Sequence, residues 1–265
     1  MARRTLHSLY LSTPWTWILA IIVLLVALLV VGLYTKRITY EGYVADEEVP
    51  KDNAPFTTDN LDCYVINLKK NPDRMIQFQR TYGKTDLGKS NPIIRMEGIY
   101  GKDLPYKDYV APTPDIPLHA GMIGCFLSHL SLHKTIADGT KPYGLIFEDD
   151  ANIDPQIYTK TISSLSTVVP TDWDIILLGY FDYDKTHQYI QLDTCKKALN
   201  FWGLHGYMVN RTSAKKLHSL LQPPFYAQID HIMSKLSREG KLNIYAINRP
   251  VVWQNAKYSD VQVVK

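Results

Sequence analysis

Three acidic side chains follow one another near the middle of the chain, directly after an apolar run. Residues 143–147 read YGLIF, and Glu148, Asp149 and Asp150 come next. Carboxylates gathered at the end of a strand can bind a hard divalent cation, magnesium or manganese, together with substrate phosphates. In a continuing strand, Glu148 and Asp150 would face one side and Asp149 the other. A solvated acidic turn that caps a helix starting at Pro155 explains the same residues equally well.

Two histidines four residues apart form the second candidate group. His129 and His133 lie in residues 121–138, which have the pattern of an amphipathic helix, so both would lie on one face. The metalloprotease signature needs Glu directly after the first histidine, but Leu130 stands there. The sequence therefore favours one buried, hydrogen-bonded histidine and one near solvent over a zinc site. Neither a nucleophile elbow nor a glycine-rich phosphate loop follows a predicted strand.

Alternating strands and helices would position these groups. Short apolar runs rich in β-branched residues predict strands, and amphipathic stretches predict helices. This alternation predicts an α/β fold with a mainly parallel sheet flanked by helices. Such sheets bind ligands at the carboxyl ends of their strands, where the acidic run lies. We expect strands at residues 63–68, 93–99, 143–147, 174–178, 204–209 and 244–247, and helices at residues 72–82, 121–137, 155–168, 212–221 and 229–238.

The amino-terminal part of the chain differs, because residues 5–35 contain no charged side chain apart from a histidine. Residues 17–34 read WILAIIVLLVALLVVGLY. As a helix they would span roughly 27 Å, close to the hydrocarbon thickness of a bilayer. A cleaved signal peptide has a shorter apolar run ending in small residues, whereas Lys36 and Arg37 follow here. The sequence therefore predicts a transmembrane anchor at residues 17–34, preceded by a short tail at residues 1–16.

A polar segment separates the anchor from the rest of the chain. Residues 41–60 hold six acids, one lysine and two prolines, so residues 35–60 are expected to form a flexible stem. Residues 61–265 are long enough for one globular domain. Of the 29 basic residues, Arg3 and Arg4 precede the anchor, which leaves 27 against 26 acids and a net charge of +1. This balance argues against nucleic acid as a partner. The three widely spaced cysteines suggest neither a disulfide framework nor a metal knuckle.

Several short motifs together resemble glycosyltransferase family 25, which includes bacterial lipopolysaccharide glycosyltransferases and collagen galactosyltransferases. The resemblance extends from about Cys63 to Asp260, and each motif is weak when taken alone. In chain order the motifs are Tyr64-Val-Ile-Asn-Leu with Asp73-Arg74, Gly124-Cys125-Phe-Leu-Ser128-His129, Phe147-Glu-Asp-Asp, Trp173-Asp174-Ile-Ile-Leu-Leu-Gly179, Gly206-Tyr207 before Ala214-Lys-Lys-Leu217, Asp230, and residues 250–254 with Ser259-Asp260.

This resemblance implies a nucleotide-diphospho-sugar transferase fold of the GT-A type, a UDP-sugar donor, usually UDP-galactose, and manganese as the divalent cation. It implies that Asp150 binds the metal and that the donor site is lined by Asn67, Arg74, Ser128, His129, Glu148 and Asp149. Arg74 has a planar fork that suits a diphosphate, but a structural ion pair with an acid is also open. His129 could equally be a buried structural residue, and Cys125 a small core residue.

A late aspartate, Asp230, matches the family's residue on the acceptor side of the metal motif. The resemblance implies inversion at the anomeric carbon, which needs a base for the acceptor hydroxyl, and a carboxylate suits that role. Asp230 would also suit the start of the predicted helix at residues 229–238, where aspartate is a favoured cap. His231 is a weaker candidate base.

Together these features predict a membrane-anchored, metal-dependent glycosyltransferase. It would move a hexose from a UDP-sugar to a hydroxyl of a glycan, a lipid-linked sugar or a protein, and galactose is the favoured hexose. Charges on both sides of the anchor leave its orientation open, whereas the family's usual topology implies a cytoplasmic amino terminus and a catalytic domain across the membrane, in the secretory lumen or its equivalent. The alternatives are an inactive, sugar-binding homologue and a metal-dependent phosphohydrolase, which would need more carboxylates and histidines for two metals.

Overall fold

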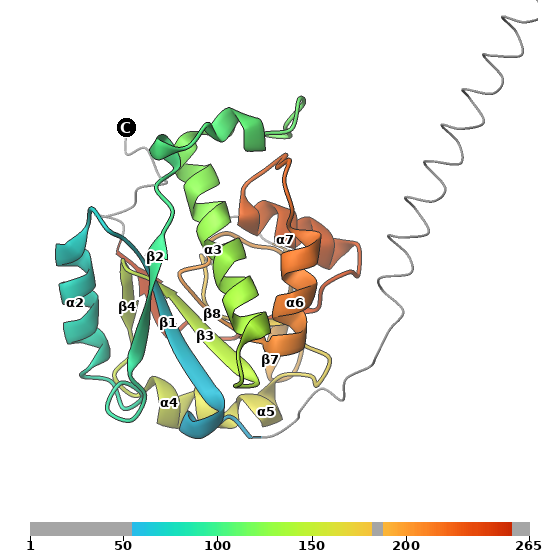
Figure 1. Cartoon of the computed structure of the whole chain (residues 1–265). Coiled ribbons are helices and arrows are strands. Elements are labelled where there is room, and N and C mark those ends of the chain that lie inside the picture. Colours follow the sequence, from blue (N-terminus) through green and yellow to red (C-terminus); the bar gives the residue numbers. More distant parts are fainter. Residues whose placement is uncertain (1–54, 182–187, 256–265) are drawn as a thin grey trace, which may run out of the picture. The chain divides into compact units, whose positions relative to one another are not determined.

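The computed structural model describes residues 55–181 and 188–255 (Figure 1). The predicted tail, the anchor at residues 17–34, most of the stem and the Ser259-Asp260 pair lie outside the described residues. Within the described ranges, every helix is too short or too polar to cross a membrane. The chain divides into a unit at Met1–Pro50 and a unit at Lys51–Lys265, and all described residues belong to the second unit.

In the described part of the chain, one eight-stranded sheet has the order β2-β1-β3-β8-β5-β9-β7-β6. The pairs β1–β2, β1–β3 and β5–β9 are parallel, and the other four neighbouring pairs are antiparallel. The strands are β1 Leu61–Leu68, β2 Ile93–Gly98, β3 Tyr143–Glu148, β5 Ile175–Gly179, β6 Gln188–Gln191, β7 Cys195–Asn200, β8 Gly206–Asn210 and β9 Ile244–Ile247.

The α/β class is as predicted, but the expectation of a mainly parallel sheet is wrong. Parallel neighbours need a long crossover, usually a helix. Strands β6, β7 and β8 follow one another without a helix between them. Residues 192–194 join β6 and β7 as an antiparallel hairpin. The sequence pattern missed β6 and β7 because these strands near the sheet edge contain many polar residues and no continuous apolar run.

Two short strands form a separate antiparallel pair next to the acidic run. Strand β4 (Ala151–Ile153) pairs with β10 (Val252–Gln254), with Gln254 opposite Ala151. The pairing brings the end of the described chain to the position just after Asp150. Neither strand was predicted, because three-residue strands leave too short a pattern in the sequence.

Helices pack on both faces of the sheet (Figure 1), and the alternation of side chains in the strands divides the core in two. In β1, Tyr64 points into one core cluster and Val65 into the other. The first cluster lies under α3 (Ala120–Asp138), α6 (Arg211–Leu220) and α7 (Ile229–Arg238). The second lies under α2 (Pro72–Tyr82), α4 (Ile157–Lys160) and α5 (Leu165–Val168).

The single helix predicted at residues 155–168 is wrong, because the segment is broken in the middle. Between α4 and α5 lies a 3-10 turn, Ile162–Ser164, which follows Thr161 at φ −132° and ψ −66°. The segment is rich in serine and threonine, whose hydroxyls bond to nearby carbonyls and compete with helix formation. Ser164 donates to the carbonyl of Thr161 in this way, at 2.9 Å.

Helix α3 approaches the preceding chain so closely that two glycines are needed. A Cβ on Gly101 would lie 1.7 Å from the carbonyl oxygen of Ala120, and one on Gly124 would lie 2.5 Å from that of Ile99. Ser128 secures the contact, because its Oγ accepts from the Ile99 amide at 2.8 Å and donates to the Gly124 carbonyl at 2.6 Å. Gly124 and Ser128 thereby fix the position of His129, which follows them on the same helix.

Candidate active site

The acidic run separates into two environments where β3 ends. Strand β3 stops at Glu148, and Asp149 and Asp150 form a turn before β4. The Glu148 carboxylate contacts His129 of α3, whereas Asp149 and Asp150 contact Arg74 of α2. The predicted sidedness is therefore only partly right: Asp149 and Asp150 share Arg74, because strand alternation stops where the chain turns, yet Glu148 still lies near enough to Asp150 to raise its pKa.

On the first side, which we call the guanidinium side, Asn67, Arg74, Asp149 and Asp150 meet. Arg74 forms an ion pair with Asp149, and its Nη2 lies 3.6 Å from Oδ2 of Asp150. The buried amide of Asn67 donates to Asp149 Oδ2 at 2.7 Å, and its oxygen accepts from Nε of Arg95 at 2.9 Å. The structural ion pair considered for Arg74 is thus present. A pocket beside these residues is lined by Arg74, Gln77, Asp149, Asp150, Asn152 and Asn255.

Asp150 has a carboxylate whose two oxygens differ. The residue is 6% exposed, and its Oδ2 accepts from Nε2 of Gln254 at 3.1 Å. Among the described residues, its buried Oδ1 has no hydrogen-bond partner. Burial and the nearby Glu148 raise the pKa of Asp150 to about 7, although Arg74 opposes the increase. A buried carboxylate oxygen without a donor, next to further carboxylates, fits the oxygen ligands that manganese or magnesium prefers.

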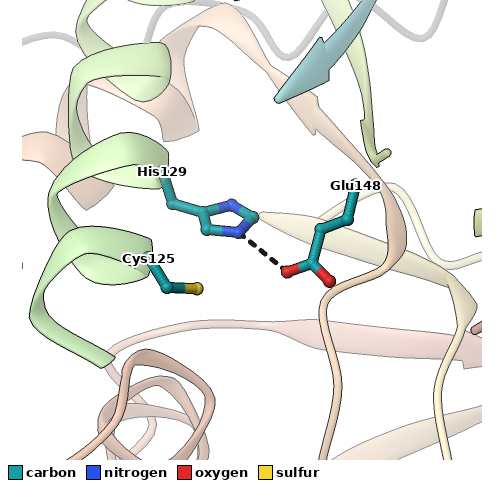
Figure 2. A group of neighbouring side chains, drawn as sticks. All are labelled: Cys125, His129 and Glu148. Carbon is teal, nitrogen blue, oxygen red and sulfur yellow. Dashed lines mark hydrogen bonds and ion pairs between the residues drawn. The ribbon is translucent and has the colours of Figure 1, made fainter. Parts of the chain in front are cut away.

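On the second side, which we call the imidazole side, Cys125, His129, Tyr207 and Glu148 meet (Figure 2 shows three of them). His129 Nε2 lies 3.3 Å from Glu148 Oε1, and its Nδ1 lies 2.9 Å from the Tyr207 hydroxyl. His133 Nε2 reaches the same hydroxyl at 2.8 Å. The expectation that one histidine lies near solvent is therefore wrong, since both are buried.

The pKa values on the imidazole side follow from burial and from the two rings. Burial, with smaller contributions from His129 and His218, lowers the pKa of His133 to about 3, so this ring is neutral at pH 7. Burial alone would raise the pKa of Glu148, but the hydrogen bond and charge of His129 bring it below its ordinary value. Burial and the nearby Glu148 and Asp230 raise the pKa of the Cys125 thiol. The thiol is therefore protonated at neutral pH when no metal is bound.

Asp230 lies in the first turn of α7, but it is not the helix cap. The N-cap position is Gln228. The Asp230 carboxylate accepts from the amide of Gly203 at 3.1 Å through Oδ2 and from that of His231 at 2.9 Å through Oδ1. Burial raises its pKa, and these two amides oppose the increase. The carboxylate is thus held in a fixed orientation near the imidazole side, where it influences Cys125 electrostatically.

The predicted donor residues are brought together only in part. Asn67 and Arg74 both contact Asp149, and His129 contacts Glu148. The hydroxyl of Ser128 is used in packing α3, so a donor contact for Ser128 stays a prediction.

Tyr207, Gln254 and Cys125 were not predicted as site residues. The four-residue spacing of Cys125 and His129 places both on one helix face and could have signalled the thiol. The strand pairing that brings Gln254 to Asp150 has no such local signal.

The model of glycosyltransferase family 25, described as LPS biosynthesis protein, matches residues 60–233. Procollagen galactosyltransferase 1-A of Xenopus laevis is 28% identical over 182 residues, which cover 59% of this chain and 28% of the relative. Procollagen galactosyltransferase 2 of Homo sapiens is 27% identical over 179 residues, covering 59% of this chain and 27% of the relative. The chain thus matches less than a third of the length of these relatives.

Among solved structures, a glycosyltransferase involved in glycosylation of the major capsid of PBCV-1 aligns with a TM-score of 0.44 and 7% identity, over 75% of this chain and 94% of that chain. A likeness this distant carries no weight for the fold or the activity. The family match does carry weight, because it covers well over half of the 265 residues and includes the acidic run, the α3 motif and Asp230. The chain therefore belongs to glycosyltransferase family 25.

Proposed function

We propose that this chain is a metal-dependent glycosyltransferase of the GT-A type that transfers a hexose from a UDP-sugar to an acceptor hydroxyl, with inversion. Galactose is the leading candidate for the hexose. The acceptor is a glycan, a lipid-linked sugar or a protein. The observation that carries the proposal is Asp150, whose buried Oδ1 has no hydrogen-bond donor among the described residues. Family membership supports the class of reaction.

In this proposal the guanidinium side binds the diphosphate end of the donor. Asp150 would hold the manganese ion, which when bound supplies positive charge that stabilises the departing nucleotide diphosphate. Arg74 presents a planar guanidinium next to the pocket, a geometry that suits phosphate oxygens. Asp149, which accepts a hydrogen bond from Asn67, holds this guanidinium in place, and His129 and Glu148 would border the donor end from the other side.

The acceptor hydroxyl needs a base, because the new glycosidic bond forms as the hydroxyl proton leaves. We assign this role to Asp230. Its raised pKa favours proton uptake, and the amides of Gly203 and His231 orient the carboxylate without occupying all of its lone pairs. In the single displacement, the acceptor oxygen bonds to the anomeric carbon, the bond to UDP breaks, and Asp230 takes the proton.

The proposal includes the membrane arrangement expected from the sequence. Residues 17–34 would anchor the chain, residues 35–60 would form the stem, and residues 61–265 would be the catalytic domain, on the side of the membrane away from a cytoplasmic amino terminus. Protease protection of the carboxyl-terminal domain in sealed vesicles would support this orientation. Cleavage of that domain from the cytoplasmic side would contradict it.

The test of the activity is a screen of UDP-sugars with manganese, in which release of UDP is measured with and without added acceptors. We expect turnover of at least one UDP-hexose, UDP-galactose first, and loss of turnover on chelation. Asp150→Asn should lose this turnover. Asp138→Asn makes the same change at an exposed aspartate and serves as its control, which should keep the turnover. A folded full-length chain that binds no UDP-sugar in the presence of manganese would contradict the proposal. Hydrolysis of simple phosphate esters without sugar transfer would favour the phosphohydrolase.

A further inference from the structure

Three different metal-binding groups converge where α3 meets the end of β3. Cys125, His129 and Glu148 each offer one ligand atom, and these atoms all lie within 4.8 Å of one another. Cys125 and His129 extend from successive turns of α3 toward Glu148 (Figure 2). The helix supplies two of the groups through their four-residue spacing, and β3 supplies the third.

The His129 ring is oriented as a metal ligand would be. Its Nδ1 is hydrogen-bonded to the Tyr207 hydroxyl at 2.9 Å, and that hydroxyl is held in turn by His133 at 2.8 Å. These contacts leave Nε2 directed at Glu148. Metal-ligating histidines almost always have the other ring nitrogen held by a hydrogen-bond partner, which fixes the ring. Tyr207 and His133 are fully buried, so this support is rigid.

We infer that Cys125, His129 and Glu148 bind a zinc ion, at a site distinct from the manganese site proposed at Asp150. A thiolate, an imidazole and a carboxylate are the ligands that zinc takes, whereas manganese prefers oxygen ligands. In tetrahedral zinc sites the ligand atoms lie roughly 3.3 to 3.8 Å apart, as bond lengths of about 2.0 to 2.3 Å require. A set already within 4.8 Å reaches that spacing through small side-chain movements.

The ordinary alternative is a hydrogen bond between His129 and Glu148, with Cys125 as a packing residue. The two accounts differ at the thiol, because only the zinc site requires its sulfur as a ligand. They also differ in the role of Tyr207, which orients a ligand in one account and fills the core in the other. Neither difference involves a sugar donor, so the inference does not rest on the proposed function.

The test is cobalt binding to the purified full-length chain, freed of metal with a chelator, because cobalt replaces zinc and reports a thiolate ligand by a charge-transfer absorption band. We expect the band in the wild type, its loss on adding zinc, and its persistence with manganese. Cys125→Ser should remove the band, and Cys195→Ser should retain it, since Cys195 is equally a free cysteine but lies on β7. Tyr207→Phe should weaken zinc binding by about 10- to 100-fold.

A wild-type chain that binds cobalt without the band, or binds none, overturns the inference, as does an undiminished band in Cys125→Ser. Unchanged zinc affinity in folded Tyr207→Phe contradicts the orientation of His129 by that hydroxyl and so also counts against the site. If Cys125→Ser does not fold, zinc X-ray absorption of the wild type decides the question. One sulfur among the ligands supports the site, and a shell without sulfur overturns it.

Discussion

The guanidinium side and the imidazole side both contain carboxylates of the acidic run, but these carboxylates have different side-chain partners. Glu148 and Asp150 are two residues apart, yet His129 lowers the pKa of Glu148 below its ordinary value, whereas burial and Glu148 itself raise that of Asp150 to about 7. Glu148 has its own partner ring, but Asp150 shares one guanidinium with Asp149. The turn at Asp149 and Asp150 therefore creates two ligand environments from one stretch of sequence.

The difference in side-chain partners is the basis for proposing two metal sites at this run instead of one. The guanidinium side offers carboxylate oxygens, which suit a hard metal ion, and the positive charge of Arg74, which suits phosphates. The imidazole side offers sulfur, nitrogen and one carboxylate. Variants that act on one side and leave the other intact should separate the two environments.

The largest effect is expected when the guanidinium side loses its metal ligand. Asp150→Asn should reduce manganese-dependent transfer at least about 1000-fold, because a bound cation contributes several kcal/mol of transition-state stabilisation. The fold should survive, since Asn still accepts from Gln254 and relieves repulsion by Glu148. Transfer rates and manganese calorimetry check this result. Unchanged affinity for manganese and UDP would remove Asp150 from the site, and the two sides would then not differ as we describe.

A smaller loss is expected from Asp230, which lies near the imidazole side. Asp230→Asn should slow transfer at least about 100-fold, because it removes a general base, while its remaining oxygen still accepts from a backbone amide. UDP and manganese binding should be unchanged.

Asp174, another aspartate of the family motifs, is not a substitute base, since its carboxylate is buried and bonded to Ser213 and Lys216. Transfer within a few fold of wild type would leave Asp230 as an orienting residue of α7 and direct attention to His231.

Acid should destabilise the imidazole side through His133. Its pKa falls from 6.5 to about 3 on folding, because the ring is buried against the Tyr207 hydroxyl with His129 and His218 nearby. The unfolded chain then takes up the proton first, so the stability is fully present above pH 6.5 and is lost progressively as the pH falls toward 3. Between pH 7 and pH 5 this amounts to roughly 2 kcal/mol of unfolding free energy.

Urea unfolding at pH 7 and pH 5 measures this loss, and His133→Gln should reduce it. The difference between wild type and variant isolates His133 from other groups such as His205, whose pKa is lowered by burial. Equal pH dependence in the two proteins would show that His133 is not held neutral by its surroundings.

The smallest effect is expected from a change of shape without a change of charge on the guanidinium side. Arg74→Lys keeps the positive charge but removes the planar fork, so UDP affinity should fall about 10-fold. Arg80→Lys on the same helix is the control, because Arg80 is exposed. Calorimetry with UDP in the presence of manganese measures the change. Equal affinity in both variants would mean that Arg74 only holds the two aspartates in place.

The sequence predicted the elements whose pattern is strong and local. Helix α7 was predicted with the observed bounds, because apolar residues recur at helical spacing from Ile229 to Leu236. Strand β9 was likewise predicted with its observed bounds, as a run of apolar residues that is buried throughout. The break at Thr161 was missed because the periodic apolar residues continue across it.

The site was predicted in composition but not in arrangement. The motifs named Arg74, His129 and the acidic run, yet whether an aspartate faces Arg74 or His129 depends on where β3 ends. Tyr207 lies on β8, which pairs with β3 in the antiparallel sense, and the alternation of strands and helices in the sequence did not indicate this pairing. Long-range pairing of this kind leaves no periodic signal in one sequence.

The contact of Gly101 with α3 makes residues 102–119 a loop whose two ends meet. Gly101 lies against the carbonyl of Ala120, so the chain leaves and returns at nearly the same point. Loop length adds little to the entropy of closing such a loop, and neither end has to move when residues are inserted. Insertions and deletions in this loop, away from residues 109–115 that bond to Phe225 and Tyr226, can therefore reshape the surface of the molecule during evolution, while Cys125 and His129 remain where Gly124 and Ser128 hold them.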